Sequence, residues 1–89
     1  MYSLLTDDLG RCYFCGKPKI SDHAIYSSLK EHEIYSEQDG MIVPVCWECN
    51  CKLHISKKMQ YQLQIEGQLA WEKAHPTEAF EKRYGRNFL

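Results

Sequence analysis

The first half of the chain holds two short stretches that predict β-strands. Residues 20–26 form the first, and the apolar, β-branched run at residues 41–45 forms the second. Pro44 has no N–H to donate, so it should lie at the edge or the end of the second strand. Between the two stretches, residues 27–40 are polar and close on Asp39-Gly40, a dipeptide typical of turns.

From residue 47 onwards, apolar residues recur at helical spacing. Residues 47–55 fit a short helix, and Ser56 is a good N-cap for a longer one. One face of the longer helix is kept apolar by Met59, Leu63, Ile65, Leu69, Ala70 and Ala74. Gly67 lies inside this helix, where glycine costs about 1 kcal/mol relative to alanine, so a close packing contact or a bend is expected there.

Pro76 ends the long helix, and a final helix should follow it. Thr77 can cap that helix over residues 78–84, and Gly85 stands in the position where a helix commonly stops. The predicted order is strand, strand, short helix and two packing helices. This order defines a small α+β fold, with a ββα core at residues 11–55, a helical extension at residues 56–89 and an N-terminal segment at residues 1–10.

Length and composition narrow the class of protein. Eighty-nine residues make one domain, and such a short chain often adds a metal or disulfides to a thin core. No apolar run approaches the roughly 18 residues that span a bilayer, so no membrane partner is expected. Asp7 and Asp8 fall where a signal peptide needs apolar residues, which predicts an intracellular protein with reduced thiols.

Charge is unevenly distributed, although the net charge is only −1. Residues 1–50 carry four Lys/Arg against eight Asp/Glu, whereas residues 51–89 carry seven against four. The basic C-terminal half permits contact with a polyanion, but the same charges also suit ordinary solvated helix faces.

Four cysteines form the clearest chemical signal. Cys12-x-x-Cys15 and Cys46-x-x-Cys49 are two knuckles with 30 residues between them. Zinc takes four ligands in a tetrahedron, and each C-x-x-C turn presents two thiolates to one ion. The pairs leave no open position, so they predict one structural zinc rather than disulfides or redox-active thiols. The fifth cysteine, Cys51, fits best as a small buried apolar side chain, with a spare thiol or a substitute ligand as alternatives.

A second group of residues could carry chemistry. Asp22-His23 falls in the first predicted strand, and Asn50 and His54 lie four apart on the short helix, which begins at the zinc site. Asp22 and the Asn50 carbonyl offer oxygen ligands to a hard cation such as Mg²⁺, and His23 could take a proton from water. Equally, Asp22 can begin a turn, His23 can be a surface imidazole and Asn50 can cap a helix.

These residues, taken with two longer strings, resemble a known family. Ser36 begins a match to S-x-x-x-G-apolar-apolar-x-apolar-C, and residues 80–89 match F-x-x-x-aromatic-G-R-N-aromatic-L. Together with the knuckles and Asp22-His23, they are similar to the zinc-bearing HNH, or ββα-metal, nucleases, in particular small phage-encoded members. The similarity covers residues 12–89. The tail string is specific because neither zinc nor packing is expected to demand it.

The resemblance implies roles for single residues. Asp22 matches a ligand of a catalytic Mg²⁺ or Mn²⁺, and His23 matches the general base that activates water. Asn50 stands where most members have a histidine ligand, and His54 matches a metal or phosphate contact. The implied function is hydrolysis of phosphodiester bonds in nucleic acid, most simply DNA.

The alternative is a non-catalytic zinc module that binds DNA or a protein partner through exposed aromatics and the helix at residues 57–74. A middle asparagine, which orients the base in many members, is absent near Gly40, and Glu31 and Glu33 make the preceding loop acidic. Both departures favour this alternative. A homodimer is compatible with either function.

Overall fold

Two antiparallel strands lie at the centre of the structure, a computed structural model that describes residues 2–89. β1 (Ser21–Ala24) pairs with β2 (Ile42–Val45), and both strands are shorter than the predicted runs. The Pro44 carbonyl accepts a hydrogen bond from the backbone N–H of Tyr13 at 2.8 Å. Pro44 therefore bonds on the side of β2 that faces away from β1, which is the edge position expected of proline.

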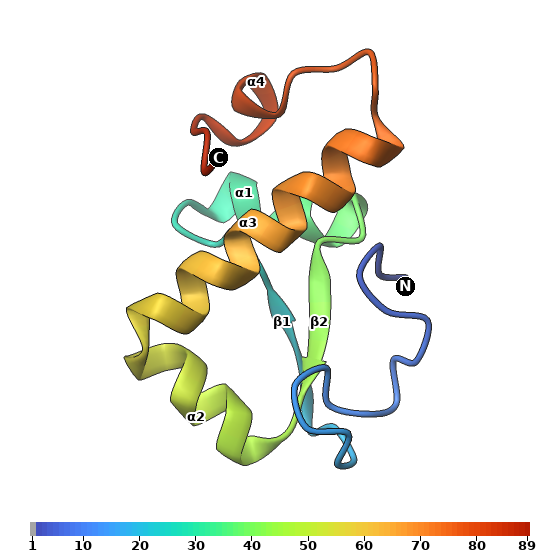
Figure 1. The fold of residues 1–89 in the computed structure, drawn as a ribbon, viewed down its shortest axis with the longest axis vertical. Helices are drawn as coiled ribbons and strands as arrows, with labels where there is room; N and C mark the ends of the chain where they lie inside the picture. The colour runs from blue at the N-terminus through green and yellow to red at the C-terminus, as the bar shows by residue number, and fades with distance from the viewer. Residues whose placement is uncertain (1) are drawn as a thin grey trace.

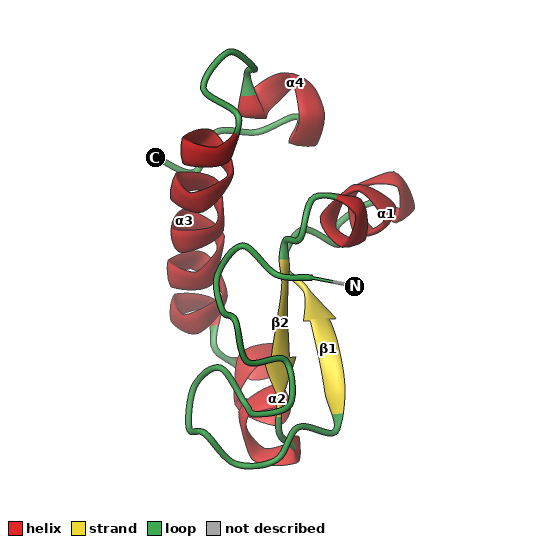
Figure 2. Cartoon of the chain, turned by 90° about the vertical axis from the view of Figure 1, so that its right-hand side faces the viewer, coloured by secondary structure: helices red, strands yellow, loops and turns green. Residues whose placement is uncertain are grey.

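Within residues 2–89 the structure has four helices (Figure 1). α1 (Lys30–Gln38) connects the two strands, and α2 (Trp47–Ile55) follows β2 directly. α3 (Lys57–Ala74) runs obliquely across the strands, and α4 (Phe80–Tyr84) follows it. Figure 2 shows α3 on one side of the strands and α1 on the other. The predicted small α+β fold is confirmed. None of these helices has the length and apolar character needed to cross a membrane.

Helix α1 corrects the expectation that residues 27–40 are simply a polar segment ending in a turn. Its buried residue is Ser36, whereas Ile34 is exposed, so the helix has no apolar stripe to reveal it. The Ser36 hydroxyl accepts a hydrogen bond from the Tyr26 N–H and donates one to the Tyr26 carbonyl. A polar side chain thus attaches α1 to the core. The turn itself forms as expected, because Gly40 adopts a φ of 72°.

Of the two N-caps predicted for the last two helices, one is confirmed and one is wrong. Ser56 caps α3 as expected, and its hydroxyl accepts the N–H of Met59 at 3.2 Å. The prediction for Thr77 is wrong, because the N-cap of α4 is Ala79 and no side chain caps that helix. A turn closed by the Glu78 N–H on the His75 carbonyl comes first and delays the start of α4.

Tyr26 lies at the centre of the core. Its ring packs against three tail rings, those of Phe80, Tyr84 and Phe88, with centroids 4.6–5.4 Å apart. Its hydroxyl reaches α3, where a Cβ added to Gly67 would lie 2.6 Å from the hydroxyl oxygen. Gly67 therefore marks a close packing contact, as the sequence predicts.

The C-terminal tail is largely determined by packing, contrary to the expectation that packing does not demand its sequence. Phe80, Tyr84 and Phe88 are buried in the core, and Gly85 ends α4 in the left-handed conformation. The Asn87 side chain accepts a hydrogen bond from the buried Gln68 amide at 2.8 Å. The aromatic, glycine and asparagine positions of the tail string are thus structural.

Asp39 joins three elements through one carboxylate. Arg83 donates two hydrogen bonds to it at 2.9 and 3.0 Å, Tyr84 donates one at 2.8 Å, and the Trp71 indole donates one at 2.9 Å. Burial disfavours the charged form of Asp39, but these hydrogen bonds outweigh burial and lower its pKa. The end of α1 is therefore held against α3 and α4 by a charge-assisted network.

Replacing Asp39 with asparagine should destabilise the protein by about 2–3 kcal/mol, because an amide cannot accept from all of these donors and removes the ion pair with Arg83. Chemical denaturation of the zinc-loaded protein measures this loss. Because the pKa of Asp39 is lower in the folded protein than in the unfolded chain, its full stabilising effect is present at pH values above the ordinary pKa of aspartate. The difference between wild type and variant should therefore shrink as the pH falls through the lowered, folded-state value.

Asp8→Asn is the matched control, because the Asp8–Arg11 pair is exposed on both sides and should change stability by less than about 0.5 kcal/mol. If Asp39→Asn and Asp8→Asn lowered the free energy of unfolding equally, the Asp39 network would stabilise the fold no more than an exposed ion pair does.

Candidate metal centre

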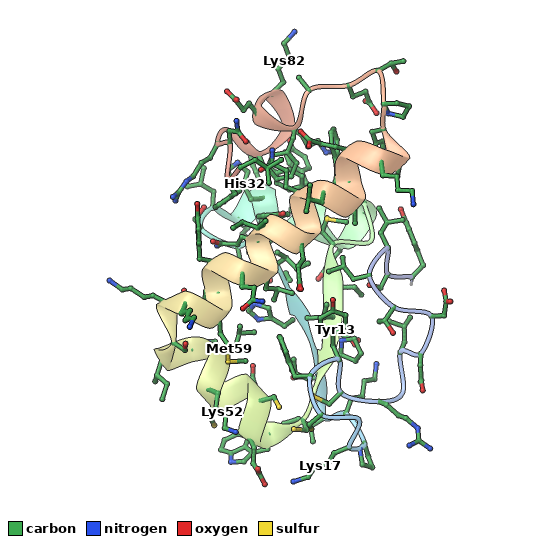
Figure 3. All side chains as sticks on the ribbon, in the orientation of Figure 1. Tyr13, Lys17, His32, Lys52, Met59 and Lys82 are labelled. Atoms are coloured by element: carbon green, nitrogen blue, oxygen red, sulfur yellow. The ribbon has the colours of Figure 1, made fainter. Side chains whose placement is uncertain are left out.

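The first knuckle is a tight turn at the N-terminal side of the strands. The Cys12 N–H donates to the Lys17 carbonyl at 2.7 Å, and the Gly16 N–H donates to the Cys12 carbonyl at 2.9 Å. Gly16 has a φ of 79°, a conformation that favours glycine. This turn brings Cys12 and Cys15 to one side. Figure 3 labels Lys17 of this knuckle at the end of the molecule where α2 begins.

The second knuckle lies where β2 passes into α2. Cys46 is the N-cap of α2, and its sulfur accepts the N–H of Cys49 at 3.5 Å. Because Cys46 ends a buried strand and Cys49 lies in the first helical turn, the strand–helix junction itself sets the direction of both sulfurs. Lys17 and Glu48 form an ion pair between the two knuckles at 3.3 Å, but both side chains are exposed, so the pair adds little.

The four sulfurs form a compact cluster. The Sγ atoms of Cys12, Cys15, Cys46 and Cys49 all lie within 4.8 Å of one another, and those of Cys15 and Cys46 are 3.5 Å apart. A tetrahedral zinc site with Zn–S bonds of about 2.3 Å requires sulfurs about 3.8 Å apart. The cluster therefore has the donor set and the size for one zinc ion, as the sequence predicts.

The close approach of the four sulfurs affects how readily each thiol ionises. Burial disfavours the Cys12 thiolate, but hydrogen bonds from backbone amides of both knuckles lower its pKa to about 6. Burial and the neighbouring sulfurs raise the pKa of Cys49. Sulfurs this close together repel one another as thiolates unless a cation lies among them, which is the role of zinc in such a site.

Cys51 is exposed, so the prediction that it is a small buried apolar side chain is wrong. The buried residues of α2 are Cys49 and Leu53, and Cys51 lies two positions from each, on the opposite side of the helix. Cys51 is also outside the sulfur cluster. Of the alternatives, a spare thiol is the one that agrees with its position.

The other predicted site residues share one open pocket of about 370 Å³. Asp22 and His23 come from β1, and Asn50 and His54 come from α2. The rings of His23 and His54 are nearly perpendicular, with centroids 6.2 Å apart. We call this the Asp22–His54 pocket. Asn50 does not cap α2, because Cys46 does.

Three features of this pocket were not predicted from the sequence. The Lys19 ammonium lies 2.9 and 3.0 Å from the two carboxylate oxygens of Asp22, and Ser27 and Glu33 also line the pocket. Within residues 2–89, the structure holds a single group of three or more His, Cys, Asp or Glu side chains close enough to bind one ion. The four cysteines are that group. Asp22 is thus neutralised by a lysine in this conformation.

No protein-family model, curated protein or solved structure matches the chain. The fold and the cysteine cluster define it as a small α+β protein with a four-cysteine site suited to one structural zinc ion.

Proposed function

We propose that this protein is a zinc-stabilised, HNH-like nuclease that hydrolyses phosphodiester bonds in DNA with the help of a second divalent cation. The observation that carries the proposal is the Asp22–His54 pocket. Four residues from two separate elements, β1 and α2, line it together, and they are the residues to which the resemblance of the sequence to ββα-metal nucleases assigns roles. The sulfur cluster supports this pocket by anchoring the start of α2.

His23 is the general base of the proposed reaction. Burial lowers its pKa, and the neighbouring His54 lowers it further. His23 is therefore neutral at pH 7 and able to accept a proton from the attacking water. His54 lies one helical turn beyond Asn50 and is exposed, which supports a phosphate contact as its role.

Asp22 and Asn50 would hold the catalytic cation through a carboxylate oxygen and an amide carbonyl, donors that suit Mg²⁺ or Mn²⁺. Such a cation supplies electrostatic stabilisation of the charge that develops on the phosphate and the leaving oxygen. Lys19 now neutralises Asp22, so its ammonium must release the carboxylate when a cation binds. Lys19 is thereby a competitor for the cation position.

A non-catalytic zinc module is the second candidate, favoured by the surface of α2. Trp47 is 66% exposed and Ile55 is 84% exposed on that helix, a surface suited to a protein partner. Glu33 in the pocket lining also disfavours phosphate.

A nicking assay on supercoiled DNA distinguishes the nuclease from the non-catalytic zinc module. The zinc-loaded protein should nick the plasmid when Mg²⁺ or Mn²⁺ is added and not in their absence. Lys19→Ala should lower the cation concentration needed, whereas Lys17→Ala, which removes an exposed lysine paired with Glu48, should not. Asn50→His should preserve or raise activity and shift preference towards transition metals.

Three results together would favour the binding module: no divalent-dependent cleavage of DNA or RNA, no second metal by titration, and no gain from Asn50→His.

A further inference from the structure

A second cavity, of about 270 Å³, adjoins the Asp22–His54 pocket and shares His23 and Ser27 with it. It lies between the loop after β1, helix α3 and the tail that follows α4. We call it the tail cavity. Figure 3 labels one of its lining residues, His32, near α4. Because His23 and Ser27 border both cavities, a strand bound in one lies next to the other.

The lining of the tail cavity favours an anion. Arg86 supplies its positive charge, and the lining contains no carboxylate. His23 and His32 add imidazole groups that can form hydrogen bonds. Ser27 and Ser28 add hydroxyl groups. Within residues 2–89, the side chains of Ser27, Ser28, His32 and Arg86 have no hydrogen-bond or ion-pair partner, so their donors are free for a ligand.

Arg86 stands out from the rest of the tail. Gly85, Asn87 and Phe88 each have a packing or hydrogen-bonding role, whereas Arg86 is exposed. Its guanidinium lies 4.7 Å from the centroid of the Phe88 ring, which holds the side chain in place. The other tail arginine, Arg83, is instead bound to Asp39. The fold thus positions one guanidinium at the cavity without using its hydrogen-bond donors.

The remaining lining suits a nucleoside. The buried rings of Tyr84 and Phe88 form an apolar wall of the cavity. The side-chain amide of Gln64 and the side-chain carbonyl of Gln60, whose N–H groups already bond to α2, offer polar groups. The volume is just below the roughly 300–1,000 Å³ of small-molecule pockets, which is room for one nucleotide rather than a long segment.

We propose that the tail cavity binds one nucleotide of a DNA strand, adjoining the phosphodiester bond held in the Asp22–His54 pocket, and that Arg86 binds the phosphate of that nucleotide. The proposal rests on the nuclease function for the identity of the neighbouring site. It assigns to the tail a substrate-positioning role, separate from the chemistry at His23.

Binding of a short, fluorescein-labelled single-stranded DNA, followed by fluorescence anisotropy, tests this. The zinc-loaded protein is used without Mg²⁺ or Mn²⁺, so that the strand is not cut. Arg86→Ala should weaken binding about tenfold or more, because it removes charge-assisted hydrogen bonds to phosphate. Arg11→Ala, which removes an exposed arginine from the first knuckle segment, should change affinity by no more than about twofold.

A second pair of variants on α3 separates local from overall charge. Gln64→Glu places a carboxylate in the tail cavity, whereas Gln62→Glu places the same charge two residues away, outside the cavity. Gln64→Glu should weaken binding about tenfold more than Gln62→Glu does. Melting curves of the four variants should match that of the wild type, since all the altered side chains lie at the surface or in the cavity.

The proposal is overturned if the wild type does not bind the strand, or if each variant and its control lose affinity equally. Binding of a free deoxynucleoside monophosphate as tight as that of the strand would also overturn it, because a strand subsite needs the neighbouring phosphate. Strand binding that depends on Arg86, without any nicking, would support nucleotide binding in the tail cavity and contradict the proposed nuclease function. Nicking that does not depend on Arg86 would support the nuclease function and contradict the role of the tail cavity.

Discussion

Replacing Cys46 with serine should leave the protein unfolded and without zinc. Cys46 is buried and contributes to the sulfur cluster, so the substitution removes a zinc ligand. Serine can still cap α2, so the expected loss comes from the metal site and not from the helix start. Apparent zinc-binding free energies of structural sites are about 10–16 kcal/mol, comparable to the whole stability of a small domain. Circular dichroism and zinc analysis of the purified variant measure both effects. The wild type should carry about one zinc per chain.

Cys51→Ala is the matched control, because it removes an exposed cysteine from the same helix. Zinc content and melting temperature should stay close to those of the wild type. Two outcomes would contradict this assignment. One is a metal-free wild-type protein that melts at the same temperature as the zinc-loaded protein. The other is loss of zinc from Cys51→Ala while Cys49→Ala retains it.

The sequence predicts the elements whose signals are local. The two knuckles, α2 and α3 follow from C-x-x-C spacing, helical periodicity and the Ser56 cap, each carried by a few neighbouring residues. Helix α1 could not be predicted in this way, because it is held by the Ser36 hydroxyl on the Tyr26 backbone rather than by an apolar face. Helix α4 begins later than the Thr77 cap predicts, because a backbone turn closed by the Glu78 N–H on the His75 carbonyl precedes it.

For the candidate site, too, the sequence predicted some features and missed others. The resemblance assigns Asp22, His23 and Asn50 to one site, and these three residues line one pocket. Lys19 was not recognised as a partner of Asp22, although its spacing of three residues could have suggested the contact. The Asp39 network could not be foreseen, because its donors lie at least 32 residues away along the chain.

His23→Ala should reduce the rate of DNA cleavage by about 10²–10⁴, the usual contribution of a general base. The zinc content and melting curve should remain those of the wild type, because the imidazole is neither a ligand of the sulfur cluster nor part of the main core. Single-turnover nicking with saturating Mg²⁺ measures the rate. His75→Ala is the control, since it removes an imidazole that lines neither the Asp22–His54 pocket nor the tail cavity.

The pH dependence of the same reaction tests the role of His23 independently. A base acts only when it is neutral, so the rate should rise with pH through the pKa of His23 and then level off. Because burial and His54 hold that pKa below the ordinary value of about 6.5, the rise should be centred below pH 6.5. Replacing His54 with glutamine removes one cause of the lowering and should move the rise upwards, towards the ordinary value. A His23→Ala protein that keeps more than about a tenth of the wild-type rate, with an unchanged pH profile, would show that another group activates the water.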